Sequence, residues 1–267
     1  MALPKLSVPI YHLKVSSTKQ ELQYRPFLVK EEKILLMAAE SEDEAEMATA
    51  LKQIINNCVQ NEDFDVNILP TFDLEYVFLQ LRAKSVGEIA DLHIFCQNPV
   101  RLDIKDDLGN RGIESAGAKP ENEKTTRLCL REIPITVNLS KIKVKTTKGH
   151  TENIMLEKEN NIGVIMRYPD LEEIATLRSI DSDIEKSMGL MVSCVQSIYD
   201  GDSVYHAKDT PPEEMLTWVD GLNNKQMQAL QDFFTTMPAL KHDVKYECPG
   251  CGYKGTVTLE GLADFFE

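Results

Sequence analysis

Two segments in the first third of the chain carry apolar residues at helical spacing, with polar residues between them. The first follows a capping box at Ser41 and Glu44 and predicts a helix over about 42–60. The second follows Pro70 in TFDLEYVFLQLRAKSVG, where Thr71 can cap a helix and Gly87 can end it. We expect the apolar faces of these helices to be Met47, Leu51, Ile54, Ile55, Cys58 and Val59 in the first, and Leu74, Val77, Phe78 and Leu81 in the second.

Other parts of the first half alternate between apolar and polar residues, which is typical of strands. Residues 1–30 alternate in this way around prolines, which indicates an extended arm or edge strands. Within residues 88–148, the stretches LHIFC and LCLREIPITVNLSKIKVKT alternate and predict strands. The segment near 104–126 is charged, rich in small residues and without periodicity, so we expect a long mobile loop there.

The second half returns to helical spacing. The stretch IGVIMRY predicts a strand, and YPDLEEIATL predicts a short helix capped by Asp170. Helical spacing then runs from Asp181 to Ile198, and Thr210 with Glu213 forms another capping box. The last helical stripe, ahead of two closing strands VKYEC and GTVTLEG, consists of Met227, Leu230, Phe234 and Met237.

Together these segments predict an α+β protein, in which short helices pack on antiparallel strands and the chain ends in a zinc-ribbon-like β knuckle. We divide the chain into three parts. Residues 1–30 form an extended N-terminal arm, and residues 31–150 form an α+β lobe with the mobile loop near 104–126. Residues 151–267 form a helical lobe that ends in the cysteine knuckle hairpin.

The charge of the chain narrows the range of partners. The 267 residues carry a formal net charge of -14, with 42% hydrophobic residues, so the protein can bury a core but repels phosphate backbones. A partner with a basic surface fits this charge better than nucleic acid. The one basic patch, in KIKVKTTKGH, has alternating lysines that we expect to face water.

The compartment follows from what the sequence lacks. Apolar runs of the roughly 20 residues that a membrane helix needs are missing, and the start MALPKLSVPIYHLKV does not resemble a signal peptide. Six unevenly spaced cysteines do not form the pattern of a secreted disulfide framework. We therefore expect a reducing cytoplasm, with thiols free or bound to metal.

The strongest chemical signal is the stretch KYECPGCGYK near the end of the chain. Cys248 and Cys251 are spaced so that a tight turn, permitted by Gly250 and Gly252, can direct two thiolates at one metal ion. A redox CxxC usually opens a helix, whereas this pair joins two predicted strands. Three interpretations stay open at this point: a zinc knuckle, two structural cysteines without metal, and a redox pair.

A structural zinc site requires four ligands, and an upstream pair can supply the other two. The segment from Cys96 to Cys129 resembles the terminal knuckle, because each has a strand that ends in cysteine, a second cysteine and a further strand. If the mobile loop is an insertion into this upstream knuckle, then Cys96, Cys129, Cys248 and Cys251 form one structural zinc site. The alternatives are that Cys96 and Cys129 are ordinary half-buried strand residues, or that His242 is a ligand.

Signals for catalysis are weak. The five histidines do not pair at metal-site spacing, and the chain has neither a glycine-rich phosphate loop nor an HExxH or GxSxG motif. Asp73 and Glu75 are two residues apart on a predicted helix, where their side chains point in different directions and favour the helix start. Cys58 and Cys194 lie on apolar helix faces and are expected to be buried core thiols. We therefore predict that the protein is not an enzyme.

Several stretches together resemble a baseplate hub subunit, or hub-assembly protein, of T4-like contractile-tailed phages. They are YRPFLVKEEKILLMAAES, FDLEYVFLQLRAKSVGE, LTWVDGLNNKQMQALQDFFTTMPALKH and VKYECPGCGYKGTVTLEGLADFF. The likeness covers most of the chain, and the FDLEY block and the cysteine knuckle are its most specific parts. The segment near 104–126 departs from the compact first knuckle expected there.

The resemblance implies a hub component or a hub-assembly chaperone that binds other hub or tail proteins without covalent chemistry. It places the protein in the host cytoplasm during assembly, and in the tail baseplate if it stays in the virion. Two other classes remain as alternatives: a zinc-ribbon module that binds nucleic acid, and a metal-dependent hydrolase. The sequence leaves the oligomeric state and the identity of the partners open.

Overall fold

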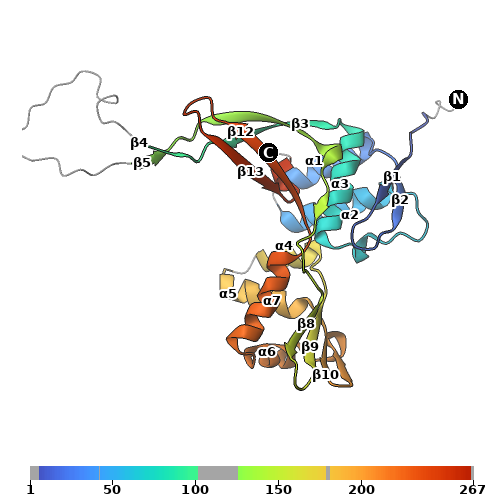
Figure 1. The fold of residues 1–267 in the computed structure, drawn as a ribbon. Coiled ribbons are helices and arrows are strands. Elements are labelled where there is room, and N and C mark those ends of the chain that lie inside the picture. The colour runs from blue at the N-terminus through green and yellow to red at the C-terminus, as the bar shows by residue number, and fades with distance from the viewer. Residues whose placement is uncertain (1–5, 42, 102–125, 179–180, 266–267) are drawn as a thin grey trace, which may run out of the picture.

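The computed structural model describes residues 6–41, 43–101, 126–178 and 181–265. The mobile loop predicted near 104–126 lies outside these residues up to position 125. The protein is an α+β protein with small antiparallel sheets, as the sequence predicted. Figure 1 shows two lobes, a first lobe that contains both ends of the described chain and a second lobe that contains its middle.

The first lobe begins with a hairpin packed against helices. Strands β1 (Tyr11–Lys14) and β2 (Glu21–Tyr24) pair antiparallel, and their inward side chains meet helices α2 (Glu44–Cys58) and α3 (Thr71–Ser85). This core consists mainly of Leu13, Val15, Leu22, Tyr24, Leu51, Ile54, Ile55, Cys58, Leu74, Val77, Phe78 and Leu81. The two predicted helical stripes are therefore confirmed as buried faces.

The structure corrects the start of α2. The side chain of Asp43 caps this helix, because its Oδ1 accepts hydrogen bonds from the backbone N–H groups of Ala45 and Glu46. The expected cap, Ser41, instead ends a separate helix α1 (Val29–Ser41) and donates to the carbonyl of Ala38. Helix α1 was not predicted, because its apolar residues form no single buried stripe: Val29, Leu36 and Met37 are exposed.

The start of α3 also differs from the prediction. Pro70 occupies the cap position without a side-chain cap bond, and the Thr71 hydroxyl donates to the carbonyl of Pro169 in the second lobe. Asp73 lies in the first turn, as expected, but it is completely buried. Its two carboxylate oxygens accept hydrogen bonds from the backbone N–H groups of Ser16 and Ser17 at 3.0 and 2.9 Å. This carboxylate therefore fixes the β1–β2 turn to α3.

Two long hairpins complete the first lobe. Strand β3 (Ile89–Phe95) pairs with β6 (Glu132–Asn138), and the hairpin continues through β4 (Pro99–Arg101) and β5 (Thr126–Leu128). At the other end of the chain, β12 (Ala239–Glu247) pairs with β13 (Lys254–Glu260) and, at its start, with β7 (Val144–Lys145). Both hairpins pack on α3 around Leu79, Ala83, Leu92, Ile135, Leu240, Leu259 and Phe265. The predicted strands are confirmed, although the stretch LCLREIPITVNLSKIKVKT is divided into β5, β6 and β7 and contains a 3₁₀ turn after β6.

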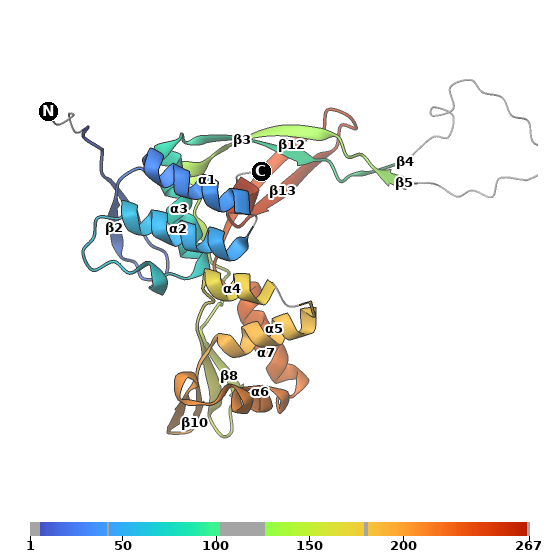
Figure 2. The same cartoon turned by 180° about the vertical axis from the view of Figure 1, so that it is seen from behind.

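The second lobe packs helices against a four-stranded sheet (Figure 2). The strands, in the order β11-β10-β9-β8, are β8 (Asn153–Glu157), β9 (Ile162–Met166), β10 (Val195–Asp200) and β11 (Ser203–His206). The helices are α4 (Leu171–Arg178), α5 (Asp183–Ser193), α6 (Pro212–Asp220) and α7 (Asn224–Thr236). A third core, around Val164, Met166, Met191, Val195, Val219 and Leu230, lies within this lobe.

Two predictions for the second lobe were wrong. The helix expected to reach Ile198 ends at Ser193, and the following residues form β10, which pairs with β9. A bulge between Val195 and Ser197 lets Val195 and Ile198, three residues apart as in a helix, lie on the same face of the sheet. Thr210 does not cap α6: Pro211 occupies the cap position and the Thr210 hydroxyl donates to the carbonyl of His206. The cap of α4 by Asp170 is confirmed, since its Oδ1 accepts from the N–H of Glu173.

The chain also forms four short 3₁₀ turns in its described part: η1 (Val66–Ile68), η2 (Leu139–Lys141), η3 (Ala207–Asp209) and η4 (Ala263–Phe265). Among the described helices, none is long and apolar enough to cross a membrane. Our division of the chain into an N-terminal arm, an α+β lobe and a helical lobe stays a prediction. The structure adds that the terminal hairpin, assigned there to the helical lobe, packs in the first lobe.

Candidate metal centre

The tips of the two long hairpins bring four cysteines together. The Sγ atoms of Cys96 and Cys251 are 3.7 Å apart, and those of Cys129 and Cys248 are 3.8 Å apart. All four Sγ atoms lie within 4.8 Å of one another. Figure 1 shows the β12–β13 tip beside the point where the β3–β6 hairpin continues into β4 and β5. The structure thus assembles the four cysteines that the sequence comparison of the two knuckles had selected.

Backbone turns in both hairpins position the sulfur atoms. In the terminal knuckle, the N–H of Cys248 bonds to the carbonyl of Tyr253, and Gly252 adopts a positive φ of 69° that favours glycine. The N–H of Gly252 in turn bonds to the carbonyl of Cys248. This tight turn directs Cys248 and Cys251 to the same side.

The upstream knuckle is held in a similar way. The N–H of Cys129 bonds to the carbonyl of Asn98, and the carbonyl of Cys96 accepts from the N–H of Leu130. Leu130 has a positive φ of 50°, an uncommon conformation for a residue with a side chain. The ladder is therefore distorted beside Cys129, in a way that lets both cysteines of this hairpin face the terminal knuckle.

The surroundings of the thiols differ. Cys96 and Cys248 are buried, whereas Cys129 and Cys251 are half-buried. Burial raises the pKa of the Cys96 thiol to about 12. Burial also acts to raise the pKa of Cys248, but the backbone N–H groups of Cys251 and Gly250 stabilise its thiolate and lower the pKa to about 7. The terminal turn is thus arranged to hold a negatively charged sulfur.

The geometry fits a tetrahedral zinc ion. Zinc–sulfur bonds of about 2.3 Å in a tetrahedron require sulfur–sulfur edges of about 3.8 Å, which two of the pairs already have. Four thiolates are also a donor set that selects soft or borderline ions such as zinc. His242 does not belong to this cluster of possible ligands among the described residues. Because Cys248 and Cys251 lie between two strands, the helix start of a redox CxxC is missing here.

Two neighbours of the cluster carry no motif of their own in the sequence. The side-chain amide of Asn98 points at the sulfur of Cys251, at 3.7 Å. The side chain of Arg131 lies over Gly250, where an added Cβ would be 3.2 Å from its Nε. Each residue follows an upstream cysteine by two positions, and this spacing is the one sequence signal that could have selected them.

The comparisons with known proteins identify the family. The family described as T4 bacteriophage base plate protein matches residues 8–267. The chain belongs to this family. No curated protein and no solved structure matches the chain. The family match spans both hairpins and the second lobe, so the resemblance noted in the sequence is confirmed at the level of a baseplate protein.

The other two cysteines of this baseplate protein lie in separate cores. Cys58 is buried between the hairpin β1–β2 and the helices of the first lobe, and Cys194 is buried in the second lobe. Burial raises the pKa of Cys58 to about 11 and that of Cys194 to about 12. Both are therefore inert core thiols at neutral pH, as predicted.

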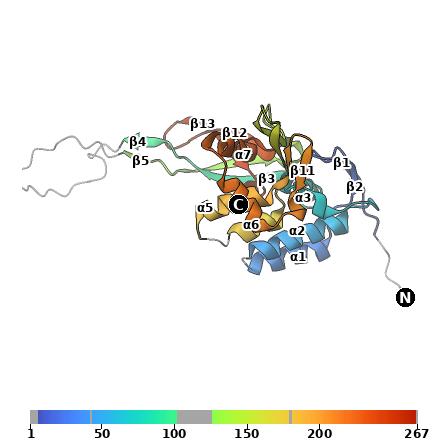
Figure 3. The ribbon, with the colours of Figure 1, turned by 90° about the horizontal axis from the view of Figure 1, so that it is seen from below.

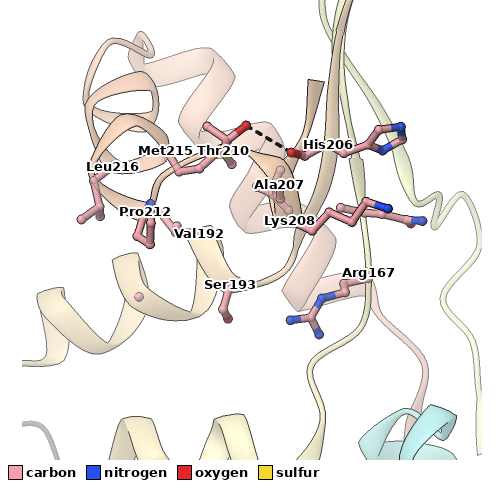
Figure 4. Close-up of a pocket in the computed structure, with 13 residues that line it drawn as sticks. Arg167, Val192, Ser193, His206, Ala207, Lys208, Thr210, Pro212, Met215 and Leu216 are labelled. Carbon is pink, nitrogen blue, oxygen red and sulfur yellow. Dashed lines mark hydrogen bonds between the residues drawn. The ribbon is translucent and has the colours of Figure 1, made fainter. Parts of the chain in front are cut away.

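A further candidate site is a cavity of about 780 Å³ in the second lobe (Figure 4). Its apolar wall includes Met215 and Leu216, and Arg167, His206 and Lys208 lie at its other side. The two hydroxyls that line it are engaged elsewhere: the Ser193 hydroxyl donates to Leu190, and that of Thr210 to His206. Neither is thus placed as a nucleophile beside a histidine base, so the cavity shows no catalytic pair.

Proposed function

We propose that this protein is a component of the phage baseplate hub, or a chaperone for its assembly, and acts by non-covalent binding of other hub and tail proteins. The observation that carries the proposal is the baseplate family match over residues 8–267. The protein would act in the host cytoplasm while the hub is built. It would be found in the tail baseplate of the virion if it is a permanent component.

The described surface supports a binding role. Exposed apolar side chains are available on several elements, including Val29, Leu36 and Met37 on α1. The net charge of -14 favours partners with basic surfaces and disfavours the alternative of a nucleic-acid-binding zinc ribbon.

We also propose that the four cysteines hold one structural zinc ion. Cys96, Cys129, Cys248 and Cys251 would each provide one thiolate and fill all four positions of a tetrahedral ion. Such a closed site leaves no position for a substrate or an activated water, which disfavours the alternative of a metal-dependent hydrolase. The protein would therefore work without catalysing a chemical reaction.

A bound zinc ion would link two hairpins that are far apart in the sequence. The pair Cys96 and Cys251 is separated by 155 positions, and the pair Cys129 and Cys248 by 119. Such a link removes much of the freedom of the unfolded chain and contributes to folding free energy. Within the folded protein it would fix the hairpin tips in one orientation for a partner.

The baseplate role is tested in a phage whose gene for this protein carries an early stop codon. We expect infected cells to contain filled heads but no complete baseplates, seen by electron microscopy, and a plasmid copy of the gene to restore tails. Mass spectrometry of purified tails then separates a component, which is present in them, from an assembly chaperone, which is missing. Normal baseplates without the protein would contradict the proposal.

The zinc proposal has a separate test. Elemental analysis of tag-free protein should find about one zinc per chain, with four thiols protected until a chelator is added. Cys129→Ser should lower the zinc content strongly, while the matched core variant Cys194→Ser should keep it. A half-equivalent of zinc would indicate a site shared by two terminal knuckles, and six reactive thiols without metal would refute the zinc site.

A further inference from the structure

In the two-stranded sheet β3–β6, the outer edge of β3 is not paired with another described strand. The N–H of Cys96 bonds to the carbonyl of Arg131, and the carbonyl of Glu88 accepts from the N–H of Leu139. Hydrogen-bonded pairs recur at every second residue of an antiparallel ladder. The backbone N–H and C=O groups of the even-numbered residues of β3 therefore point toward β6. The backbone N–H and C=O groups of Ile89, Asp91, His93 and Phe95 therefore point to the opposite edge.

The described residues provide no further strand against this edge, since the sheet consists of β3 and β6 alone. Figures 1 and 2 both show β3 on the side of the first lobe that faces away from the second lobe. The outer edge of β6 is different. Pro134, which lies opposite His93, has no N–H, so this edge lacks one of the donors that a further strand would need. One edge of the sheet is thus interrupted by proline and the other is left able to pair.

The sequence of β3, IADLHIF, is complementary to itself in the antiparallel sense. When two copies are centred on Leu92, Ile89 of one copy lies opposite Phe95 of the other, and Asp91 lies opposite His93. The backbone N–H and C=O groups of these odd-numbered residues point to the open edge. The register that pairs Ile89 with Phe95 and Asp91 with His93 therefore also allows backbone hydrogen bonds between the two copies. The apolar members are available: Ile89 and Phe95 are 55% and 58% exposed.

We propose that two copies of this protein associate through their β3 strands into one continuous antiparallel sheet of four strands. The arrangement is two-fold symmetric, so the aspartate–histidine pair and the isoleucine–phenylalanine pair each occur twice. Shifting one copy by two residues would place Asp91 opposite Asp91, or His93 opposite His93, and would shorten the overlap. This inference depends on the sheet edge and not on the proposed function.

Existing contacts of the two polar residues leave room for this pairing. Asp91 accepts a hydrogen bond from the Thr136 hydroxyl, and Nδ1 of His93 lies 2.6 Å from a carboxylate oxygen of Glu132. Both partners lie on β6, on the side away from the second copy. His93 would then lie between Glu132 of its own strand pair and Asp91 of the other copy.

Sedimentation equilibrium of the full chain tests the proposal, and we expect a concentration-dependent monomer–dimer equilibrium. His93→Asp places aspartate opposite aspartate and should weaken association by roughly tenfold, because two cross-strand pairs change from favourable to unfavourable. The double variant Asp91→His/His93→Asp exchanges the two residues, so that aspartate again lies opposite histidine, and should restore the wild-type affinity. The matched control is His12→Asp, which removes a similar cross-strand contact with Glu21 in another sheet and should leave association unchanged.

Amide hydrogen exchange of the wild-type protein, followed by NMR, gives a second measurement that needs no variant. The amides of Ile89, Asp91, His93 and Phe95 should gain protection as the protein concentration rises, while the alternate amides of β3 are protected at all concentrations. A protein that stays monomeric up to its solubility limit would overturn the proposal. So would a dimer that His93→Asp leaves unchanged, or a double variant that does not recover.

Discussion

Glu31 is a buried carboxylate that joins α1 to the end of the N-terminal hairpin. Its side chain is completely buried, and Oε1 lies 2.9 Å from Nη2 of Arg25. Its Oε2 accepts a hydrogen bond from the backbone N–H of Leu28, at the start of the helix. Burial acts to raise the pKa of Glu31, but Arg25 and the Leu28 N–H stabilise the anion, and the net result is a lowered pKa.

This carboxylate should make stability depend on pH in the acid range. Because its pKa is lower in the folded state, its contribution is present above the unfolded pKa of about 4.3 and is lost as pH falls through the folded pKa. We expect Glu31→Gln to lower the unfolding free energy at pH 7 by about 1–3 kcal/mol, and by much less near pH 3. Urea unfolding at both pH values measures this difference.

The matched control for this prediction is Glu32→Gln, which removes the neighbouring, exposed carboxylate in the same helical turn. A surface carboxylate contributes little, so this variant should stay within about 0.5 kcal/mol of the wild type at both pH values. An equal loss of stability at pH 7 and pH 3 in Glu31→Gln would show that the side chain acts through packing and not through its charge.

At the scale of single residues, the sequence allowed us to predict which residues could bind a metal ion, but not which carboxylates are buried. Cys248 and Cys251 were found by their local spacing, and Cys96 and Cys129 were found because their segment resembles the terminal knuckle. Asp73 was assigned to the helix start, and its bonds to Ser16 and Ser17 were missed, because both partners lie more than 50 positions away. Only the assembled fold shows which carboxylate is buried.

At the scale of elements, the cysteine cluster should stabilise the two long hairpins more than the helices. Cys248→Ser and Cys251→Ser each remove one sulfur ligand from the point where the hairpin tips meet. The helices α2 and α3 keep their own apolar core with β1 and β2. We therefore expect hydrogen exchange of β12 and β13 to accelerate by about tenfold or more, with α2 still protected. Mass spectrometry of the exchanged peptides measures both regions at once.

The core variant Cys194→Ser provides the contrast for this experiment. Its thiol is buried in the second lobe, so the change should affect exchange there and leave β12 and β13 as in the wild type. Equal loss of protection along the whole chain in Cys248→Ser would contradict a local role for the cluster.

Elements with one clear apolar stripe and a nearby stop signal were predicted well, as α2, α3 and α7 show. Helix α1 was missed because its apolar residues are partly exposed, which blurs its period. Strand β10 was read as helix because Val195 and Ile198 continue the spacing of α5, and only pairing with β9 decides between the two structures. Periodicity therefore failed where tertiary contacts determine the local structure.

At the scale of the whole molecule, the second lobe is inserted into the first. Strand β7, just before this lobe in the sequence, pairs with β12, just after it: Lys145 lies opposite Ala239.

The lobes also touch through a few contacts, including the Phe72 and Tyr168 rings at 5.1 Å and an ion pair between Lys52 and Glu172. Figure 3, seen from below the second lobe, shows β4 and β5 extending well beyond its helices. A sequence division at residue 150 could not reveal that the chain returns to its first lobe.

This topology predicts that the first lobe folds without the second. Because Lys145 and Ala239 are neighbours in an antiparallel pair, a two-residue Asn-Gly turn can join them directly in place of residues 146–238. The shortened chain keeps both cores of the first lobe and all four clustered cysteines. It exposes Phe72 and leaves Lys52 without its partner, which should lower the unfolding free energy by about 2–4 kcal/mol.

Thermal unfolding by circular dichroism and zinc analysis should therefore show a cooperative, less stable, zinc-binding protein. The same chain with Cys129→Ser should lose the metal, and a shortened chain that is unfolded even with zinc would show that the second lobe is required for the first to fold.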